Sequence, residues 1–286
     1  MHVRPAPLML ALCVFALSLA VMFGAWRVAE GELARNTQSE FDFQVRQTVR
    51  RIDQRMDTYE QVERGVQAFL LGSMAVPKED FRLYVASLRL AEKFPGIQGL
   101  ALAALVPPRD GAASATSTIT HIEPSTGMNA RALGFDMLSE PTRREAMERA
   151  RDSGEAAASG KVRLVQEHGG NEQTGLVMYL PVYGRGLPLQ TREQRRASLV
   201  GWVGAPFRMG DLMAGLGGER ESDIVLSIYD GVAMTSAQRL YVSPAAAAAA
   251  HRPLFQDTRH IMVGGRPWTL AIASAPLFEA RMHSDK

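Results

Sequence analysis

Two hydrophobic patterns follow one another in the first quarter of the chain. Residues 8–26 read LMLALCVFALSLAVMFGAW, a run without any charged residue. A helix of about 20 apolar residues can span a bilayer. His2 and Arg4 precede the run, and Trp26 ends it with the amphipathic ring that membrane interfaces favour. We therefore expect a cytoplasmic N-terminus at residues 1–7 and a transmembrane helix at residues 8–26, with the rest of the chain outside the cytoplasm.

A cleaved signal peptide is the alternative interpretation of the same segment. Ser18-Leu19-Ala20 has the small residues that a cleavage site needs, but it lies inside the apolar run rather than after it. An uncleaved membrane anchor is therefore favoured.

The second pattern is a stripe of apolar residues spaced by three or four positions. This period is close to a heptad and predicts a helix, and no proline interrupts residues 28–74. We expect a long helix over residues 27–76. Its stripe either packs on its own domain or pairs with a second copy in a homodimer, and both can hold for different parts of the helix. The stripe consists of Val45, Val49, Ile52, Met56, Tyr59, Val62, Val66 and Phe69.

After Pro77 the pattern changes to short apolar runs separated by glycine, proline and polar clusters. Residues 78–94 predict a second helix, and another runs from an N-cap at Ser139 to Ser153, where Gly154 stops it. The other runs mostly follow one another with short connections, which favours antiparallel sheets and an α+β fold. The expected strands are residues 97–107, 118–124, 156–159, 162–166, 175–183, 199–207, 223–230, 239–243 and 261–274.

A domain boundary is expected near Phe207. One series of strands ends there, and residues 208–216 read as a short helix that introduces the next series. The sequence therefore indicates two sheet-containing lobes, residues 77–207 and residues 208–286, carried by one long helix.

Composition narrows the possible partners. The chain has 286 residues and a net charge of only +2, with 46% hydrophobic and 22% charged residues. These proportions are ordinary for a folded protein, and no concentrated basic surface indicates a nucleic-acid partner. The single cysteine, Cys13, lies in the apolar run, so no intrachain disulfide can form.

No motif indicates catalysis. The chain lacks a G-x-S-x-G nucleophile elbow, an H-E-x-x-H zinc motif and a complete phosphate-binding loop. His121 with Glu123 and His168 with Glu167 are two-residue combinations that are too short for a metal site. We expect no catalytic residue, no metal and no cofactor. An extracytoplasmic hydrolase using His121 or His168 is the less favoured alternative.

Asp136 is the residue that the pattern leaves unexplained. It stands between Phe135 and Met137, before the helix that ends at Ser153. A carboxylate in an apolar pocket accepts N–H donors of a ligand strongly. The alternative is that Asp136 caps the following helix. Because Ser139 already fits that cap, ligand contact is favoured.

Four stretches, in this order, resemble the CHASE domain, the extracellular sensor module of membrane histidine kinases and diguanylate cyclases. They are residues 94–107, 133–167, 174–188 and 199–207. The resemblance covers about residues 80–270 and implies two tandem PAS-like lobes on a long N-terminal helix. The membrane-distal lobe, residues 77–207, would hold the ligand, and residues 208–286 would form the membrane-proximal lobe. A second transmembrane helix and a cytoplasmic output domain normally follow in the family, and we expect them outside these 286 residues.

The resemblance also implies site residues. The family's ligand-binding aspartate corresponds to Asp136, flanked by Phe135 and Met137. Its small pocket strand corresponds to Ala158 and Ser159, which are smaller than the plant receptors' residues and predict a wider pocket floor.

Four further positions belong to the expected pocket. Tyr179 stands where plant receptors have a threonine. Leu100 and Leu102 are candidate pocket walls by alternation, or plain core. Arg163 either balances Asp136 or meets an anionic ligand, and the alternative is a surface arginine on an alternating strand.

The sequence therefore predicts a sensor domain at the inner membrane, with its lobes in the periplasm. It would bind a small organic ligand, for which an adenine or cytokinin-like molecule is one candidate, and act as a homodimer. A scavenger or co-receptor without an output domain is the alternative.

Overall fold

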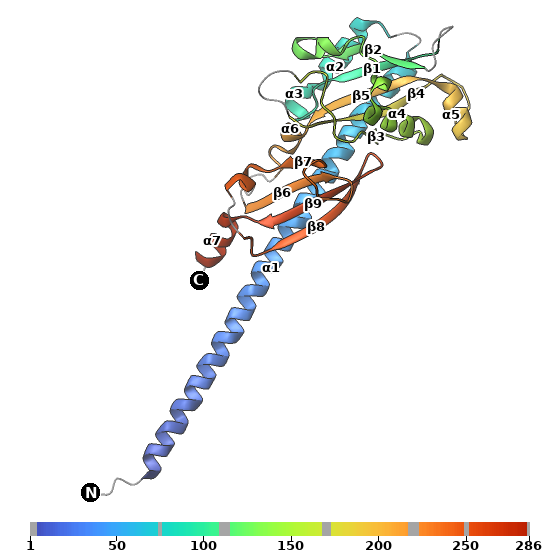
Figure 1. Ribbon diagram of the computed structural model, residues 1–286. Coiled ribbons are helices and arrows are strands. Elements are labelled where there is room, and N and C mark those ends of the chain that lie inside the picture. Colours follow the sequence, from blue (N-terminus) through green and yellow to red (C-terminus); the bar gives the residue numbers. More distant parts are fainter. Residues whose placement is uncertain are drawn as a thin grey trace.

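One long helix carries two antiparallel sheets in the computed structural model (Figure 1). The structure describes residues 5–73, 76–108, 115–167, 173–216, 223–248 and 252–284. Its elements are α1 (Pro5–Gly72), α2 (Lys78–Leu88), α3 (Leu90–Lys93), β1 (Leu100–Val106), β2 (Thr116–Glu123), η1 (Gly127–Ala132), η2 (Met137–Ser139), α4 (Pro141–Ser153), β3 (Ala157–Ala158), β4 (Gly175–Tyr183), α5 (Arg192–Ser198), β5 (Leu199–Arg208), α6 (Met209–Met213), β6 (Ile224–Asp230), β7 (Arg239–Val242), η4 (Pro244–Ala248), β8 (Gln256–Val263), β9 (Arg266–Ser274) and α7 (Pro276–Ser284).

The two sheets define two lobes. The distal lobe contains the sheet β2-β1-β5-β4-β3 and lies at the C-terminal end of α1 (Figure 1). The proximal lobe contains the sheet β7-β6-β9-β8 and lies beside the middle of α1. All strand pairings within these sheets are antiparallel. The α+β fold with two antiparallel sheets and a long helix is therefore confirmed.

The apolar stripe of α1 packs against the chain's own lobes. Ile52, Val66 and the other stripe residues are buried, and only Val49 and Phe69 remain partly exposed. The helix contacts β4 and β5 of the distal lobe and β8 of the proximal lobe. Because the stripe forms the core between α1 and both sheets, a second copy would have to use another face of the helix.

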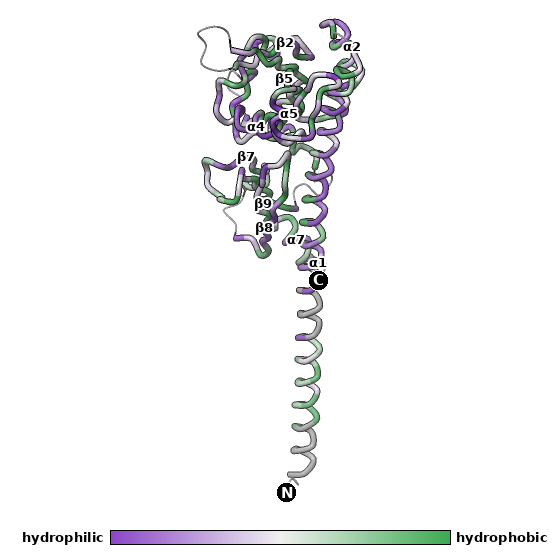
Figure 2. The backbone as a smooth tube through the Cα atoms, turned by 90° about the vertical axis from the view of Figure 1, so that its right-hand side faces the viewer, coloured by the Kyte–Doolittle hydropathy of each residue, from purple (hydrophilic) through white to green (hydrophobic). Residues whose placement is uncertain are grey.

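The first part of α1 extends beyond both lobes and is largely hydrophobic where Figure 2 colours it. Over the residues that the structure describes, no helix combines the length and the hydropathy that crossing a membrane requires. The transmembrane helix expected at residues 8–26 lies partly outside them, because the side chains of residues 8–11 and 13 are not described. The exposed apolar side chains of the segment are Leu12, Val14, Phe15, Leu17, Leu19, Val21, Met22, Phe23 and Trp26.

Several local predictions were wrong. The expected strand at residues 162–166 forms only an isolated bridge from Val162 to Gly175, because the chain turns at residues 165–166. The expected single strand at residues 261–274 is a hairpin. Its two-residue turn, Gly264-Gly265, has positive φ at both positions, the backbone that such a turn requires.

Two helices also differ from the prediction. Arg89 adopts the left-handed conformation, with φ of 54°, and divides the expected helix at residues 78–94 into α2 and α3. The polar loop between β4 and β5 contains α5, which begins with a capping box between Thr191 and Gln194.

Candidate functional site

The distal sheet has two buried faces with different partners. Leu100 and Leu102 on β1 face the cluster that includes α1 and α2. Ala101 and Ala103 face the opposite cluster, which includes α4, η1 and η2. This follows from the period of two along a strand. Leu100 and Leu102 are therefore core residues between the sheet and the helices rather than walls of a cavity on the α4 side.

A small cavity lies between the sheet and the α4 layer. Its volume is about 10 Å³, which is room for about one water molecule. Ala158 and Ser159, the residues of the expected pocket floor, do not line this cavity. The residues that line the cavity are Ala101, Ile119, Ile122, Ala132, Met137, Arg143, Val165, Gln166, Val177, Gly204 and Pro206.

Arg143 is the one charged residue in that lining, and its side chain is almost completely buried. Its Nη2 donates to the carbonyl of Arg163 at 2.9 Å, and its Nη1 approaches the Sδ of Met137 at 4.0 Å. The guanidinium also lies over the ring of Phe135, 5.9 Å from its centroid. A buried cation in an apolar cavity is costly unless it is paired, so this side chain indicates a functional position.

Arg143 was not among the expected site residues, because charged residues on a charged helix are usually solvated. A signal was present. Arg143 lies three, four and seven positions before Ala146, Met147 and Ala150, which are the buried face of α4. Its spacing therefore places it on the packed side of the helix.

Glu140, rather than Ser139, caps α4. The Glu140 carboxylate accepts the backbone N–H of Thr142 at 3.0 Å and that of Arg143 at 2.9 Å. Its distance to Nε of Arg143 is 3.8 Å, too long for a hydrogen bond. Ser139 instead donates its hydroxyl to the carbonyl of Asp136. The capping prediction for Ser139 was wrong because the helix begins one residue later than the serine allows.

Asp136 links the η2 turn to the sheet through hydrogen bonds. Its Oδ1 accepts the backbone N–H of Ser117 at 2.8 Å and that of Leu138 at 3.0 Å. The side chain is half-buried and stands beside Met137, which lines the cavity, without lining it itself. The capping role that the sequence left open is therefore present, although at η2 rather than at α4.

Tyr179 is fully buried on β4, on the same face of the sheet as Val177. Within the described residues its hydroxyl has no hydrogen-bond partner. Burial raises the pKa of this phenol to about 12, with the nearby charge of Arg143 acting in the opposite direction. The guanidinium therefore lies close to the phenol oxygen, toward which it can donate. At physiological pH the hydroxyl keeps its proton and can donate it.

Ala158 and Ser159 lie at the edge of the distal sheet, away from the cavity lining. Ser159 Oγ accepts the N–H of Val177 at 2.9 Å and donates to the carbonyl of Gly160 at 2.9 Å. The side chain of Ala158 belongs to the cluster that faces α1. Arg163 is exposed, and it reaches the site only through its backbone carbonyl, which binds Arg143.

His121, which the sequence offered as an alternative, packs within the distal lobe. His121 packs edge-on against Phe81, 5.5 Å between ring centroids, and its Nδ1 lies 2.9 Å from the hydroxyl of Thr120. Burial lowers the pKa of His121. His168 lies outside the described residues. In the part of the chain that the structure describes, no three metal-ligating side chains gather.

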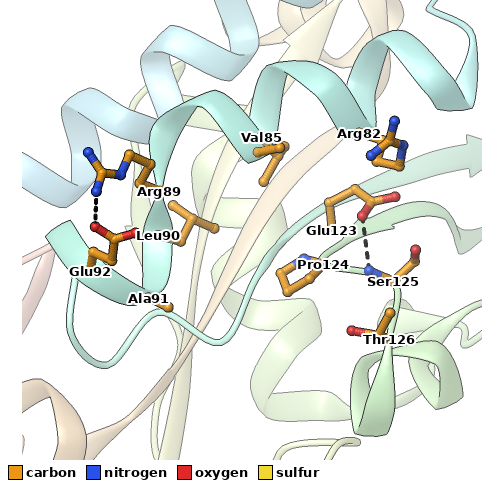
Figure 3. A pocket seen from close by; sticks show the side chains of 11 residues that line it. Arg82, Val85, Arg89, Leu90, Ala91, Glu92, Glu123, Pro124, Ser125 and Thr126 are labelled. Carbon is orange, nitrogen blue, oxygen red and sulfur yellow. Dashed lines mark hydrogen bonds and ion pairs between the residues drawn. The ribbon is translucent and has the colours of Figure 1, made fainter.

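A larger hollow of about 380 Å³ lies on the outside of the distal lobe, between α2, α3 and the turn after β2 (Figure 3). Of its charged side chains, Arg82 pairs with Glu79 and Arg89 with Glu92 on the surface, and Glu123 accepts the backbone N–H of Ser125 at 2.9 Å. Exposed pairs of this kind contribute about 0–1 kcal/mol and do not demand a ligand. The small cavity with a buried cation is the better candidate site.

Comparison with known proteins gives one family. The model of the CHASE domain matches residues 74–241, which is more than half of the chain. The chain is also similar to the extracellular domain of a protein named as a histidine kinase, at 12% identity and a TM-score of 0.48, over 88% of this chain and 96% of that one. A domain of a sensory box/GGDEF family protein from Vibrio parahaemolyticus is similar at 11% identity and a TM-score of 0.48, over 87% of this chain and 99% of that one.

Proposed function

Because this chain belongs to the CHASE domain family, we propose that it is the input part of a membrane-anchored sensor that binds a small organic ligand outside the cytoplasm. The ligand signal would pass to a kinase or cyclase output domain outside these residues, and the chain itself would catalyse no reaction. The observation that carries this proposal is the cavity of the distal lobe, which holds the buried guanidinium of Arg143 among apolar side chains. Few polar groups in an apolar pocket are typical of small-molecule sites.

The proposed binding site surrounds this cavity. Phe135 and Met137 contact Arg143 directly, and Tyr179 lies near it. Asp136 occupies the family's ligand-contact position at the border of the cavity. A ligand larger than one water molecule would have to widen the cavity. The thioether of Met137 and the turn at residues 165–166 are the adaptable parts of its wall.

The route to the proximal lobe would begin at α4. Arg149 Nη2 donates to the carbonyl of Ala158 at 2.6 Å, and the N–H of Ala158 donates to the carbonyl of Gly264 at 2.9 Å. Two consecutive hydrogen bonds therefore connect helix α4 to the edge strand β3, and β3 to the β8–β9 turn. A ligand that favours one position of α4 would bias the position of this turn.

A second contact joins the same elements. Arg266, at the start of β9, donates to Asp230 with Nη2 at 2.8 Å and reaches Glu145 of α4 with Nη1 at 3.3 Å. Rotation of one lobe against the other would have to break or rearrange both the Ala158–Gly264 hydrogen bond and the Arg266–Glu145 contact.

Membrane attachment and dimerisation are parts of the proposal. The exposed apolar side chains between Leu12 and Trp26 would lie in the membrane, and extraction of the full chain with detergent but not with carbonate would support this. A homodimer would use a face of α1 other than its buried stripe. Light scattering of the detergent-solubilised chain measures the oligomeric state.

Thermal unfolding of the full chain in the presence of candidate compounds tests ligand binding. Adenine derivatives, amino acids and short carboxylates are suitable candidates, and a ligand present at 100 times its Kd should stabilise the fold by about 2.7 kcal/mol. Ala101→Val would fill the cavity and remove this stabilisation. Ala103→Val is the matched control, because Ala103 is on the same strand and face but does not line the cavity. Equal responses of the two variants would contradict the placement of the site.

A further inference from the structure

The positive charge of Arg143 is incompletely compensated. The described residues offer it one carboxylate, Glu140, whose oxygens are already bound to two backbone N–H groups of α4. Its strongest partner is a neutral carbonyl, that of Arg163. A buried cation with this set of partners gains most from an additional anion.

Hydrogen-bond donors without strong acceptors lie in the cavity lining, at Arg143, and next to that lining, at Tyr179. The Nη1 of Arg143 contacts the thioether of Met137 at 4.0 Å, and sulfur is a weak acceptor. The hydroxyl of Tyr179 has none within the described residues and keeps its proton, because burial raises its pKa to about 12. Buried donors left without acceptors are costly, so the site is suited to a group that accepts from both.

Asp136 argues against a ligand that is recognised chiefly by its own N–H donors. The Oδ1 of Asp136 already accepts the backbone N–H groups of Ser117 and Leu138. The polar lining of the cavity is Arg143 and Gln166, and the rest is aliphatic, thioether, glycine or proline. The ligand should therefore combine one anionic group with a short apolar part.

We propose that the distal-lobe cavity binds a small monocarboxylate, with Arg143 as its ion-pair partner and the hydroxyl of Tyr179 as a second donor. A planar guanidinium matches a carboxylate with two parallel hydrogen bonds. The single cation in the lining indicates a ligand with one carboxylate. The cavity volume of about 10 Å³ indicates a molecule of few atoms, which has to widen the cavity to enter it. This inference rests on the proposed sensor function and specifies the ligand class of that site.

The test compares carboxylates with their neutral amides. The full chain is unfolded thermally in sodium acetate, propionate or pyruvate, with sodium chloride at the same ionic strength as the reference. The carboxylates should raise the Tm in a concentration-dependent way, whereas acetamide and propionamide should leave it unchanged. Equal stabilisation by the amides, or no stabilisation by any of the three carboxylates, overturns the proposal.

Two variants separate recognition from folding. Tyr179→Phe removes only a hydroxyl that has no partner within the described residues, so the Tm without ligand should not fall. Its affinity for the carboxylate should fall about tenfold, because a hydrogen bond to a charged group is lost. Arg143→Gln should lower the affinity by on the order of a hundredfold.

Arg144→Gln is the matched control for Arg143→Gln, because Arg144 is on the same helix but exposed. If Arg143→Gln does not fold, the carboxylate affinity of Tyr179→Phe is the deciding measurement. Unchanged carboxylate affinity in Tyr179→Phe contradicts the assigned second donor.

One outcome distinguishes this proposal from the sensor function. If a neutral compound stabilises the chain and Ala101→Val removes that effect while carboxylates do nothing, the sensor site stands and the carboxylate assignment fails.

Discussion

The backbone N–H of Ala158 donates a hydrogen bond of 2.9 Å to the carbonyl of Gly264. Ala158 belongs to the edge strand of the distal sheet, and Gly264 to the β8–β9 turn of the proximal lobe. The two lobes therefore meet backbone to backbone, where a side chain would not fit. The lobes are therefore joined by this hydrogen bond and by the contact of Arg266 with Glu145, in addition to their packing on α1.

Gly264→Ala should weaken the contact between the two lobes. A Cβ at Gly264 would lie 2.5 Å from the backbone nitrogen of Ala158, and the residue has a φ of +51°. Steric displacement adds to the left-handed backbone strain, so the free energy of unfolding should fall by about 2–4 kcal/mol. Urea denaturation measures this change.

Gly265→Ala is the control for that substitution. It has a φ of +67°, but its nearest neighbours are side-chain atoms of Arg149 at 3.6 Å and beyond. This substitution should lower the free energy of unfolding through backbone strain alone, by about 1–2 kcal/mol. If both variants lose the same stability, the close approach at Gly264 contributes nothing.

The ion pair between Arg266 and Asp230 should stabilise the fold more than a surface pair does. The Asp230 side chain is only 10% exposed, so Arg266→Ala would leave a largely buried carboxylate without its cation. We expect the free energy of unfolding to fall by about 2–3 kcal/mol. Arg259→Ala breaks the pair with Asp257 in the same lobe, where the arginine is 50% exposed, and should cost about 0.5 kcal/mol or less. Chemical denaturation of both variants checks the difference.

Glu63 should make the chain more stable at mildly acidic pH than at neutral pH. Its carboxyl is fully buried on α1, and burial first, then the charge of Glu60, raises its pKa well above the usual range. The backbone of Ala205 lies nearby, yet within the described residues neither carboxyl oxygen is hydrogen-bonded. The folded state therefore binds this proton more tightly than the unfolded state does. Stability should fall as pH rises above the unfolded-state value and become constant above the folded-state pKa.

Glu63→Gln tests this pH dependence. The variant should lose the fall in stability with rising pH and be more stable than the parent at neutral pH, because no buried carboxyl has to ionise. Glu148→Gln, on the exposed face of α4, should leave the pH profile unchanged. A parent chain whose Tm is the same from mildly acidic to neutral pH would show that Glu63 is not buried as described.

Asp136→Ala should lower stability, whatever the ligand is. The substitution removes the acceptor of two backbone N–H groups, those of Ser117 and Leu138. Loss of an N-cap typically costs about 1–2 kcal/mol, and the second bond adds to it. Asp136→Asn keeps an oxygen acceptor and should cost less. If ligand binding is lost in Asp136→Asn while stability is retained, the carboxylate contacts the ligand; retained binding would limit Asp136 to its structural role.

Part of the candidate site could be predicted from the sequence. The segment around Asp136 was identified because a carboxylate between Phe135 and Met137 departs from a simple apolar run, and both neighbours contact the buried Arg143. Arg143 itself was missed, because a charged residue on a charged helix is usually solvated. Its burial depends on the carbonyl of Arg163, which lies 20 residues away and comes close only after folding.

The sequence by itself determined the local elements. The three-and-four spacing of the stripe produces α1, because side-chain burial follows the period of the helix. The short, nearly continuous apolar runs at residues 175–183 and 199–207 produce β4 and β5, which are buried on both faces of the sheet. The tertiary structure decided what each face meets. Periodicity states that Leu100 and Ala101 point to opposite sides, but only the packing of α1 on one side and α4 on the other makes the first a core residue and the second a cavity wall. The partner of the α1 stripe was also decided by the tertiary structure, because the chain's own lobes cover it. Contacts between distant segments depend on how whole elements are arranged and not on the local pattern.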